Sequence, residues 1–337
     1  MFDLRLSPEQ LEIRDTVRDF VEREIKPQAL ASARLEAFER PLLTGLLEGA
    51  SRLGLRTLAL PEDLGGAGAD ALTRAIVTEE LAAGDPDIAA VLAHTAALAR
   101  LLERGPFLPQ FLEDDRFHLA VADCNAVQGV LEGVATGVAN ATLAKVFVVR
   151  TGSGALLVPR ETKGVAVREQ PGDWYHGSCG EVTFSNCRVP AANSIDAVGP
   201  MPSILPAISL GIGRAAYEAA LAYAKLRVQG GKPIIGHQAI AAKLDGIAMR
   251  LEVARAAVWR AAWASDHPEA VADRSLPDLP LSAVAEAFAP EAMLRAAKDA
   301  AECFGAMGVM RDMPLHKYVR DARICLHSGA GLAWTSI

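Results

Sequence analysis

The sequence predicts a mainly helical protein with one small β region in its middle. Apolar residues recur at the helical period in both outer parts, short β-rich runs fill the middle, and 51% of the 337 residues are hydrophobic. A chain of this size forms a large core and two or three domains. We place an N-terminal helical domain at 1–116, a β domain at 117–195 and a C-terminal helical bundle at 196–337.

The first predicted helix begins with a strong capping signal. Ser7 suits the N-cap position, Pro8 suits the first helical position, and Gln10 completes a capping box. Residues 17–25 then follow the 3.6-residue period, and we expect Pro27 to end the helix.

Further helices complete the N-terminal part. An apolar face stops at Gly54, and Asp85 or Asp87 is expected to cap the last of these helices. The predicted helices cover residues 43–53, 71–83 and 87–102.

The middle of the chain reads as an antiparallel β region. Its β-rich runs are separated by glycine, proline, serine and asparagine, which favour turns between strands. These runs are 145–149, 154–159, 164–169 and 181–190.

Helical patterns return in the C-terminal part. One helix is predicted at 209–229, and a second follows from His237 with one apolar stripe. A third helix at 282–303 contains Pro290, which we expect to interrupt it. The stripe on the second helix consists of Ile240, Leu244, Ile247, Leu251, Ala254 and Val258.

The composition excludes several classes of function. The net charge of −7 and the pI of about 5.6 leave no basic footprint for nucleic acid. The opening "MFDLRLSPEQ" lacks a signal-peptide pattern, and the longest apolar stretch, at 204–213, is too short for a membrane helix. Five cysteines without a CxxC pair and seven histidines without ligand spacing indicate no metal site. We therefore expect a cytoplasmic protein that binds no nucleic acid, membrane or metal.

Several motifs occur in a fixed order along the chain. They are "GLRTLALPEDLGGAGAD" (54–70), "VTEELAAGD" (77–85), "VTFSNCRVP" (182–190), "YAKLRVQGGKPIIGHQAIAAKLDGIAMRLEVAR" (223–255) and "AAECFGAMGVMRDMPLHKYVRDARI" (300–324). In order and spacing these segments resemble the flavin-dependent acyl-CoA dehydrogenases. Since they span nearly the whole chain, the resemblance implies that family's fold: an N-terminal helical domain, a small β domain and a C-terminal four-helix bundle.

The resemblance also implies a reaction, a cofactor and partners. In the family, a glutamate removes a proton beside the thioester carbonyl of an acyl-CoA, and FAD accepts a hydride from the next carbon. An electron-transfer flavoprotein then serves as the redox partner. The family assembles as dimers or dimers of dimers, so we expect a homodimer or a heterotetramer with a paralogous subunit.

Four residues match positions that contact FAD across the family's subunit interface. Arg227 resembles the arginine that reaches the FAD diphosphate or adenine of a neighbouring subunit, and a guanidinium suits phosphate oxygens. Gly305 and Gly308 match two glycines near the adenosine, although they could also simply shape a turn. Glu302 stands where the family has glutamine, and a carboxylate is unfavourable near a diphosphate. Gly230 replaces the aromatic residue of the same loop.

The β region departs from the family where the flavin ring would lie. Residues 120–135 lack the Thr-Glu-Pro segment, and residues 136–139 lack the tryptophan and threonine of the Trp-x-Thr-Asn segment. This comparison predicts that the chain holds no flavin ring in its own β domain.

The family glutamate is missing at both places where family members carry it. The motif that follows Arg-Asp-Ala-Lys-Ile puts Gly329 at the glutamate, or Ser328 after a slip of one residue. The earlier position falls near Met201, in a segment without carboxylates. His327 is the one titratable side chain beside the gap, and an imidazole can accept a proton near neutral pH.

Three interpretations of function remain open. In the favoured one, the chain is a subunit of a heteromeric acyl-CoA dehydrogenase, with FAD at the interface and the glutamate on a paralogous subunit. The alternatives are an autonomous, monooxygenase-like flavoenzyme with an unusual base and a CoA-ester-binding or scaffold protein without redox activity. The sequence does not specify the acyl chain.

Overall fold

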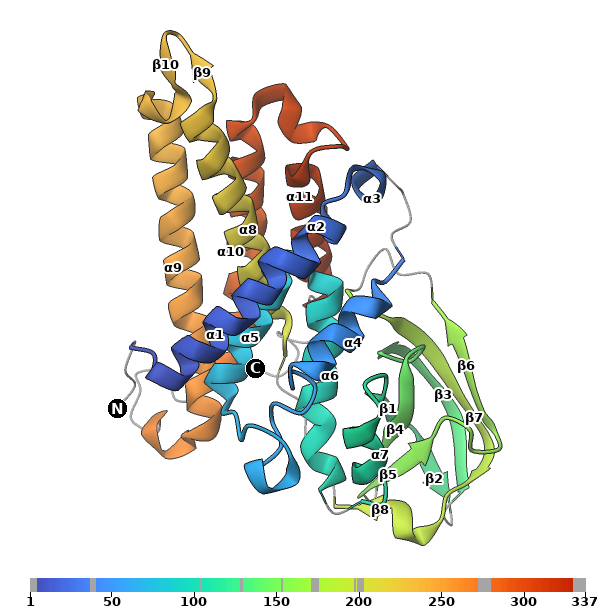
Figure 1. Cartoon of the computed structure of the whole chain (residues 1–337). Helices are drawn as coiled ribbons and strands as arrows, with labels where there is room; N and C mark the ends of the chain where they lie inside the picture. The colour runs from blue at the N-terminus through green and yellow to red at the C-terminus, as the bar shows by residue number, and fades with distance from the viewer. Residues whose placement is uncertain are drawn as a thin grey trace. The chain divides into compact units, whose positions relative to one another are not determined.

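The computed structural model shows two compact units, each built from segments that are distant in the sequence. The first unit comprises Met1–Pro41, Asp70–Ala89 and Ser203–Ile337, and the second comprises Leu42–Ala69 and Ala90–Pro202. Helices precede and follow a block of strands along the chain (Figure 1), which confirms the predicted fold class. The three domain boundaries proposed from the sequence remain a prediction. The structure describes residues 5–36, 41–103, 105–127, 130–152, 154–170, 176–196, 198, 203–271 and 280–329.

The first unit opens with helix α1 (Pro8–Phe20), and its predicted capping box is confirmed. The Ser7 hydroxyl accepts from the Gln10 backbone, and the Gln10 side chain accepts from the Ser7 backbone. The prediction that Pro27 ends the helix is wrong. A π-helical segment (Val21–Ile25) widens the turn and leads into α2 (Lys26–Ala29), where Pro27 lies in the first turn and the helix continues past it.

Asp85 provides the cap of the last N-terminal helix. Its Oδ1 accepts hydrogen bonds from the backbone of Asp87 at 3.0 Å and of Ile88 at 3.3 Å, at the start of α6 (Pro86–Ala99). This geometry decides between the two capping residues that the sequence allowed. The other helices of this part are α3 (Ser32–Glu36) and α5 (Ala71–Gly84).

Four long helices form the C-terminal bundle of the first unit. Figure 1 shows α8–α11 running alongside one another, and each packs against at least two of the others. The predicted stripe is buried from Leu244 to Val258, whereas Ile240 is half-buried. Pro290 does not interrupt its helix, so that prediction is wrong. The helices are α8 (Leu205–Leu226), α9 (Gln238–Asp266), α10 (Leu281–Cys303) and α11 (Pro314–Gly329).

A buried ion-pair network joins four helices of the first unit. Glu80 on α5 binds Arg18 of α1 and Arg214 of α8, each at 2.7 Å. Its neighbour Glu79 binds Arg255 of α9 at 2.8 Å. Because both carboxylates are almost fully buried, their arginine partners are needed to offset the loss of hydration.

A second buried cluster, which we call the α11 anchor, consists of Arg34, Asp85, Lys317 and Asp321. The Lys317 ammonium lies 2.6 Å from Asp321 on the next turn of α11, and Arg34 lies 3.4 Å from Asp85. Burial raises the pKa of Asp85, and the nearby Lys317 charge opposes that rise. The anchor therefore ties α11 to the start of α6 by charge.

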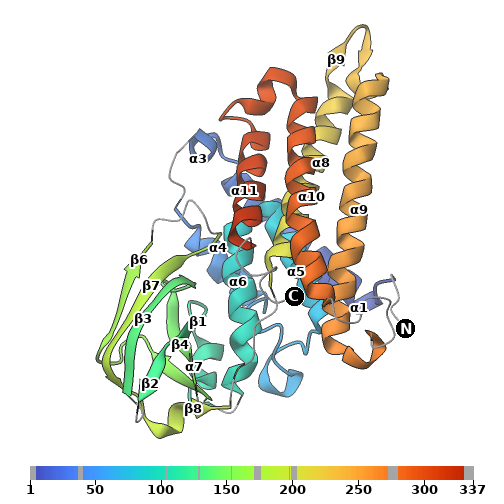
Figure 2. The same ribbon diagram turned by 180° about the vertical axis from the view of Figure 1, so that it is seen from behind.

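The second unit contains two four-stranded sheets (Figure 2). Their orders are β1-β4-β5-β8 and β2-β3-β7-β6, and Phe147 meets Phe184 edge to face in the core between them, with ring centres 6.5 Å apart. The strands are β1 (His118–Asp123), β2 (Asn125–Val127), β3 (Val130–Ala139), β4 (Ala144–Thr151), β5 (Gly154–Pro159), β6 (Val165–Glu169), β7 (Cys179–Arg188) and β8 (Ser194–Ile195).

One strand pair corrects the expectation of a purely antiparallel region. Strands β1 and β4 are parallel, with Val121 paired to Val148. After β1 the chain forms β2 and β3 of the other sheet before it returns as β4, and such a crossover permits parallel pairing. The remaining sheet pairs of this unit are antiparallel.

Short helices and buried polar groups complete the second unit. Helix α4 (Thr44–Arg52) ends just before Gly54, as predicted, and α7 (Leu108–Glu113) precedes β1. The buried Arg56 guanidinium donates to the carbonyls of Phe111 and Phe117, and burial lowers its pKa. Among the helices of the described residues, none is long and apolar enough to cross a membrane.

Candidate functional site

Arg227 lies at one end of the bundle, where a two-stranded hairpin links α8 to α9. Strands β9 (Val228–Gln229) and β10 (Lys232–Pro233) form this hairpin (Figure 1). We call this part of the first unit the hairpin end. The Arg227 backbone is fixed on both sides, because its N–H donates to Tyr223 and its carbonyl accepts from Ile234, each at 2.8 Å.

The Arg227 side chain is available for a ligand. It is exposed, and within the described part of the chain its guanidinium has no hydrogen-bond or ion-pair partner. Its neighbours Leu226 and Val228 are also exposed, at 81% and 57%. An unpaired cation between two exposed apolar side chains is typical of a surface that another molecule covers.

Gly305 and Gly308 lie at the same end of the bundle as Arg227. They belong to a 3₁₀ segment, η7 (Gly305–Val309), that follows α10. The ring of Phe304, just before this segment, stacks on Tyr223 of α8 with centres 4.1 Å apart. The structure thus brings together residues that are about 80 positions apart in the sequence.

The two glycines have different structural reasons to be glycine. Gly305 has a φ of +61°, which favours glycine, and a Cβ atom there would meet nothing within 4 Å. A Cβ atom at Gly308 would overlap the carbonyl oxygen of Ala301. Gly308 is therefore required by the turn itself, whereas Gly305 leaves open space.

Glu302 forms an ion pair that the sequence analysis missed. Its carboxylate binds the Lys243 ammonium of α9, which also lies 3.9 Å from Asp299. Asp299 in turn binds Arg250 at 2.8 Å. The hydrogen bond and charge of Lys243 lower the pKa of Glu302, and the carboxylate raises the pKa of Lys243. Lys243 and Arg250 lie two turns apart in the 223–255 motif, but this spacing did not by itself indicate a partner for Glu302.

The last turn of α11 contains no carboxylate. Ser328 and Gly329 are the final residues of the helix, and the segment from Ala322 to Gly329 has neither aspartate nor glutamate. The Ser328 hydroxyl donates a hydrogen bond to the backbone carbonyl of Ile324, 2.8 Å away within the same helix. His327 is exposed on the same turn. Met201 lies outside the described residues.

The β strands at the predicted flavin segment offer few side-chain donors. Residues 120–135 run from β1 to β3, and Thr136–Ala139 end β3. Thr136 has the only side-chain hydroxyl between His118 and Ala139. It is exposed on the strand, so this stretch presents one hydroxyl to any ligand.

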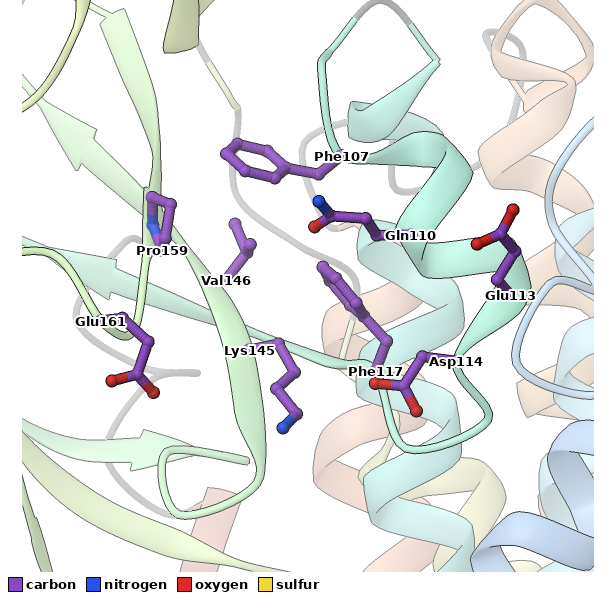
Figure 3. Close-up of a pocket in the computed structure, with 9 residues that line it drawn as sticks. All are labelled: Phe107, Gln110, Glu113, Asp114, Phe117, Lys145, Val146, Pro159 and Glu161. Atoms are coloured by element: carbon purple, nitrogen blue, oxygen red, sulfur yellow. The ribbon is translucent and has the colours of Figure 1, made fainter.

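A cavity of about 400 Å³ opens between α7 and strands β4 and β5 of the second unit (Figure 3). In Figure 3 the rings of Phe107 and Phe117 lie on either side of the Gln110 amide. Every polar lining residue except Asp114 is exposed, so no buried polar group points into the cavity to act on a substrate. We assign no chemistry to it. The lining residues are Phe107, Gln110, Glu113, Asp114, Phe117, Lys145, Val146, Pro159 and Glu161.

The described side chains form no recognisable metal site. Across the described ranges, no group of three or more histidine, cysteine, aspartate or glutamate residues is placed to hold a metal ion. Four of the five cysteines are buried, and burial raises the pKa of the Cys179, Cys187 and Cys303 thiols.

Comparisons with known proteins agree with this arrangement. Residues 7–105 match the family model of the acyl-CoA dehydrogenase N-terminal domain, and residues 204–329 match that of the acyl-CoA dehydrogenase C-terminal domain. The chain is 30% identical to the probable acyl-CoA dehydrogenase YngJ of Bacillus subtilis (strain 168), over 96% of this chain and 94% of that protein. The chain belongs to the acyl-CoA dehydrogenase family.

Other family members show similar likeness. Benzylmalonyl-CoA dehydrogenase of Aromatoleum aromaticum is 30% identical, over 97% of this chain and 96% of its own length. The structure of butyryl-CoA dehydrogenase from Megasphaera elsdenii has a TM-score of 0.81 at 23% identity, covering 97% of this chain and 96% of that chain, which confirms the fold. This acyl-CoA dehydrogenase family member is thus of the flavoprotein oxidoreductase type, for which FAD is the typical cofactor.

The two candidate FAD-binding regions of this family member differ in how well they suit the cofactor. At the hairpin end, the exposed Arg227 guanidinium suits a diphosphate, and Lys243 offsets the charge of Glu302. Strand β3 offers only the Thr136 hydroxyl where the family holds the flavin ring. The residues therefore fit the diphosphate half of FAD better than its ring.

Proposed function

We propose that this chain is a subunit of a FAD-dependent acyl-CoA dehydrogenase assembly and lacks a catalytic glutamate of its own. One observation carries the proposal: α11 ends at Ser328 and Gly329 without a carboxylate after Asp321. A paralogous subunit would supply the glutamate and most contacts to the flavin ring.

The chemistry of the reaction supports this division. Desaturation of an acyl-CoA begins when a base removes a proton from the carbon beside the thioester carbonyl. The flavin supplies the redox chemistry when it is bound. A serine hydroxyl is a poor base without a partner that takes its proton, and the Ser328 hydroxyl donates to a helix carbonyl. Proton removal is therefore assigned to the paralogous chain.

In this proposal, the chain contributes by binding and orienting the FAD of the neighbouring subunit. Arg227 would hold the diphosphate of FAD that lies mainly in the neighbouring subunit, because a guanidinium pairs with two phosphate oxygens at once. The exposed Leu226 and Val228 beside it would pack against that subunit. This arrangement makes FAD binding a property of the assembly rather than of the single chain.

The substrate class follows from the relatives, and the electron acceptor follows from the family. The relatives compared above are named for activity on acyl-CoA esters, including benzylmalonyl-CoA and butyryl-CoA. We propose an acyl-CoA thioester as substrate and an electron-transfer flavoprotein as electron acceptor. The acyl group is left open.

The test is purification of the chain alone and together with a family member encoded beside its gene. We expect a colourless protein alone and a yellow complex that bleaches when acyl-CoA is added. Arg227→Ala should lower the FAD content of that complex, while Arg260→Ala, which removes another exposed arginine, should not. A yellow protein alone that bleaches with acyl-CoA would overturn the division of labour and favour an autonomous flavoenzyme.

A further inference from the structure

We propose that Lys243 is a cofactor-positioning residue, and that its ion pair with Glu302 allows the hairpin end to accept the diphosphate of FAD. The inference rests on the proposed function and extends it to Lys243, a residue of the 223–255 motif to which the sequence comparison gave no role. It concerns a feature particular to this chain, a glutamate where its family has glutamine.

Glu302 by itself would oppose a diphosphate at this place. Its carboxylate lies in the last turn of α10, where the helix dipole already presents negative charge, and three residues before Gly305. A diphosphate ester carries two further negative charges. Like charges at such a site repel, and the repulsion is strongest when the ligand excludes water.

Lys243 removes this obstacle by direct contact. It extends from the second turn of α9 and binds Glu302, although Asp299 is also within 3.9 Å. Arg250 binds Asp299 at 2.8 Å and so leaves Lys243 to Glu302. The four side chains carry two positive and two negative charges, so each carboxylate of the cluster has a cationic partner.

The contact between Lys243 and Glu302 predicts how the variants differ. Lys243→Met leaves the Glu302 carboxylate without its lysine, so this carboxylate repels the diphosphate and FAD should bind more weakly. Glu302→Gln removes the carboxylate, so the double variant should bind FAD about as well as Glu302→Gln alone. If Lys243 acts by offsetting Glu302, its loss matters only while the glutamate is present.

The experiment is a double-mutant cycle on the complex with the paralogous subunit, with FAD affinity measured by flavin fluorescence. Lys243→Met should weaken FAD binding about tenfold when Glu302 is present, and less than about twofold in the Glu302→Gln background. The weakening should shrink at high salt, because exposed charges are screened. Lys163→Met, a lysine exposed on a turn of the second unit, controls for the loss of one positive charge.

Each outcome separates this inference from the proposed function. If Arg227→Ala lowers FAD affinity but Lys243→Met has the same effect in both backgrounds, or none, the role of Lys243 is wrong and the interface proposal stands. If Arg227→Ala has no effect, the interface proposal itself fails. Circular dichroism of each variant shows whether the bundle remains folded, so that a loss of affinity is not mistaken for unfolding.

Discussion

Removal of Lys317 should destabilise the first unit strongly. In the α11 anchor, Lys317 is 3% exposed, its ammonium lies 2.6 Å from the fully buried Asp321, and its charge also reaches Asp85. Lys317→Met keeps the length of the side chain but removes the ammonium that pairs with the buried Asp321 carboxylate, and breaking a buried ion pair costs about 3–5 kcal/mol in proteins. Arg320 lies 3.9 Å from Asp321 and offsets part of this cost, so we expect about 3 kcal/mol.

Urea unfolding followed by circular dichroism measures this loss, and two variants control it. Arg23→Met breaks the exposed pair with Asp19 and should cost less than about 0.5 kcal/mol. The double variant Lys317→Met/Asp321→Leu removes both charges and should recover most of the stability. A loss below about 1 kcal/mol in Lys317→Met would show that the carboxylate finds water or another partner, and the reasoning from burial would be refuted.

Three further perturbations follow from the structure. Burial lowers the pKa of His118 from 6.5 to about 4, so the folded protein loses stability as the pH falls from 6.5 toward 4. The variant His118→Gln should remove about 3 kcal/mol of this pH dependence, measured as urea unfolding midpoints from pH 7 to pH 4. Gly308→Ala should lower the melting temperature, because the new methyl group overlaps a carbonyl, while Gly45→Ala, with open space around it, should not. Glu80→Gln should cost about 3 kcal/mol in urea unfolding, since it removes the buried carboxylate that pairs with the buried Arg214 and the partly exposed Arg18; an unchanged midpoint would contradict the role of the network.

Local signals in the sequence predicted the helices well. The capping box at Ser7 and the stripe from Leu244 to Val258 depend on residues within a few turns of each other, and both are confirmed. Pro27 and Pro290 were misread, because a proline does not always end a helix: Pro27 lies in the first turn of α2, and α10 continues through Pro290 although a proline in a helix interior removes one backbone hydrogen bond. A wide π turn accommodates the first of these prolines, and the helix continues through the second.

Strands β1–β3 had no clear signal. The stretch from His118 to Ala139 is rich in alanine, glycine and valine and shows little alternation of apolar and polar residues, so periodicity did not identify it. Local patterns also could not predict that each unit is built from separate segments of the chain, because this depends on contacts between residues that are far apart in the sequence.

The candidate site was only partly accessible from the sequence. Motif order predicted Arg227, Gly305 and Gly308, and the structure gathers them at one end of the bundle. The partner of Glu302 was not predicted, since Lys243 is 59 residues away and lies on another helix. Only the antiparallel packing of α9 and α10 brings the two charges together.

The packing at Gly308 bears on how relatives of this protein should be compared. Because the turn excludes any side chain there, selection for folding alone would keep this glycine, even in a lineage that had ceased to bind a cofactor. Folding places no such demand on the Arg227 side chain, which is exposed and touches no partner in the described chain. In such a lineage the arginine would drift first, so its retention or loss among orthologues is the more informative record of cofactor binding.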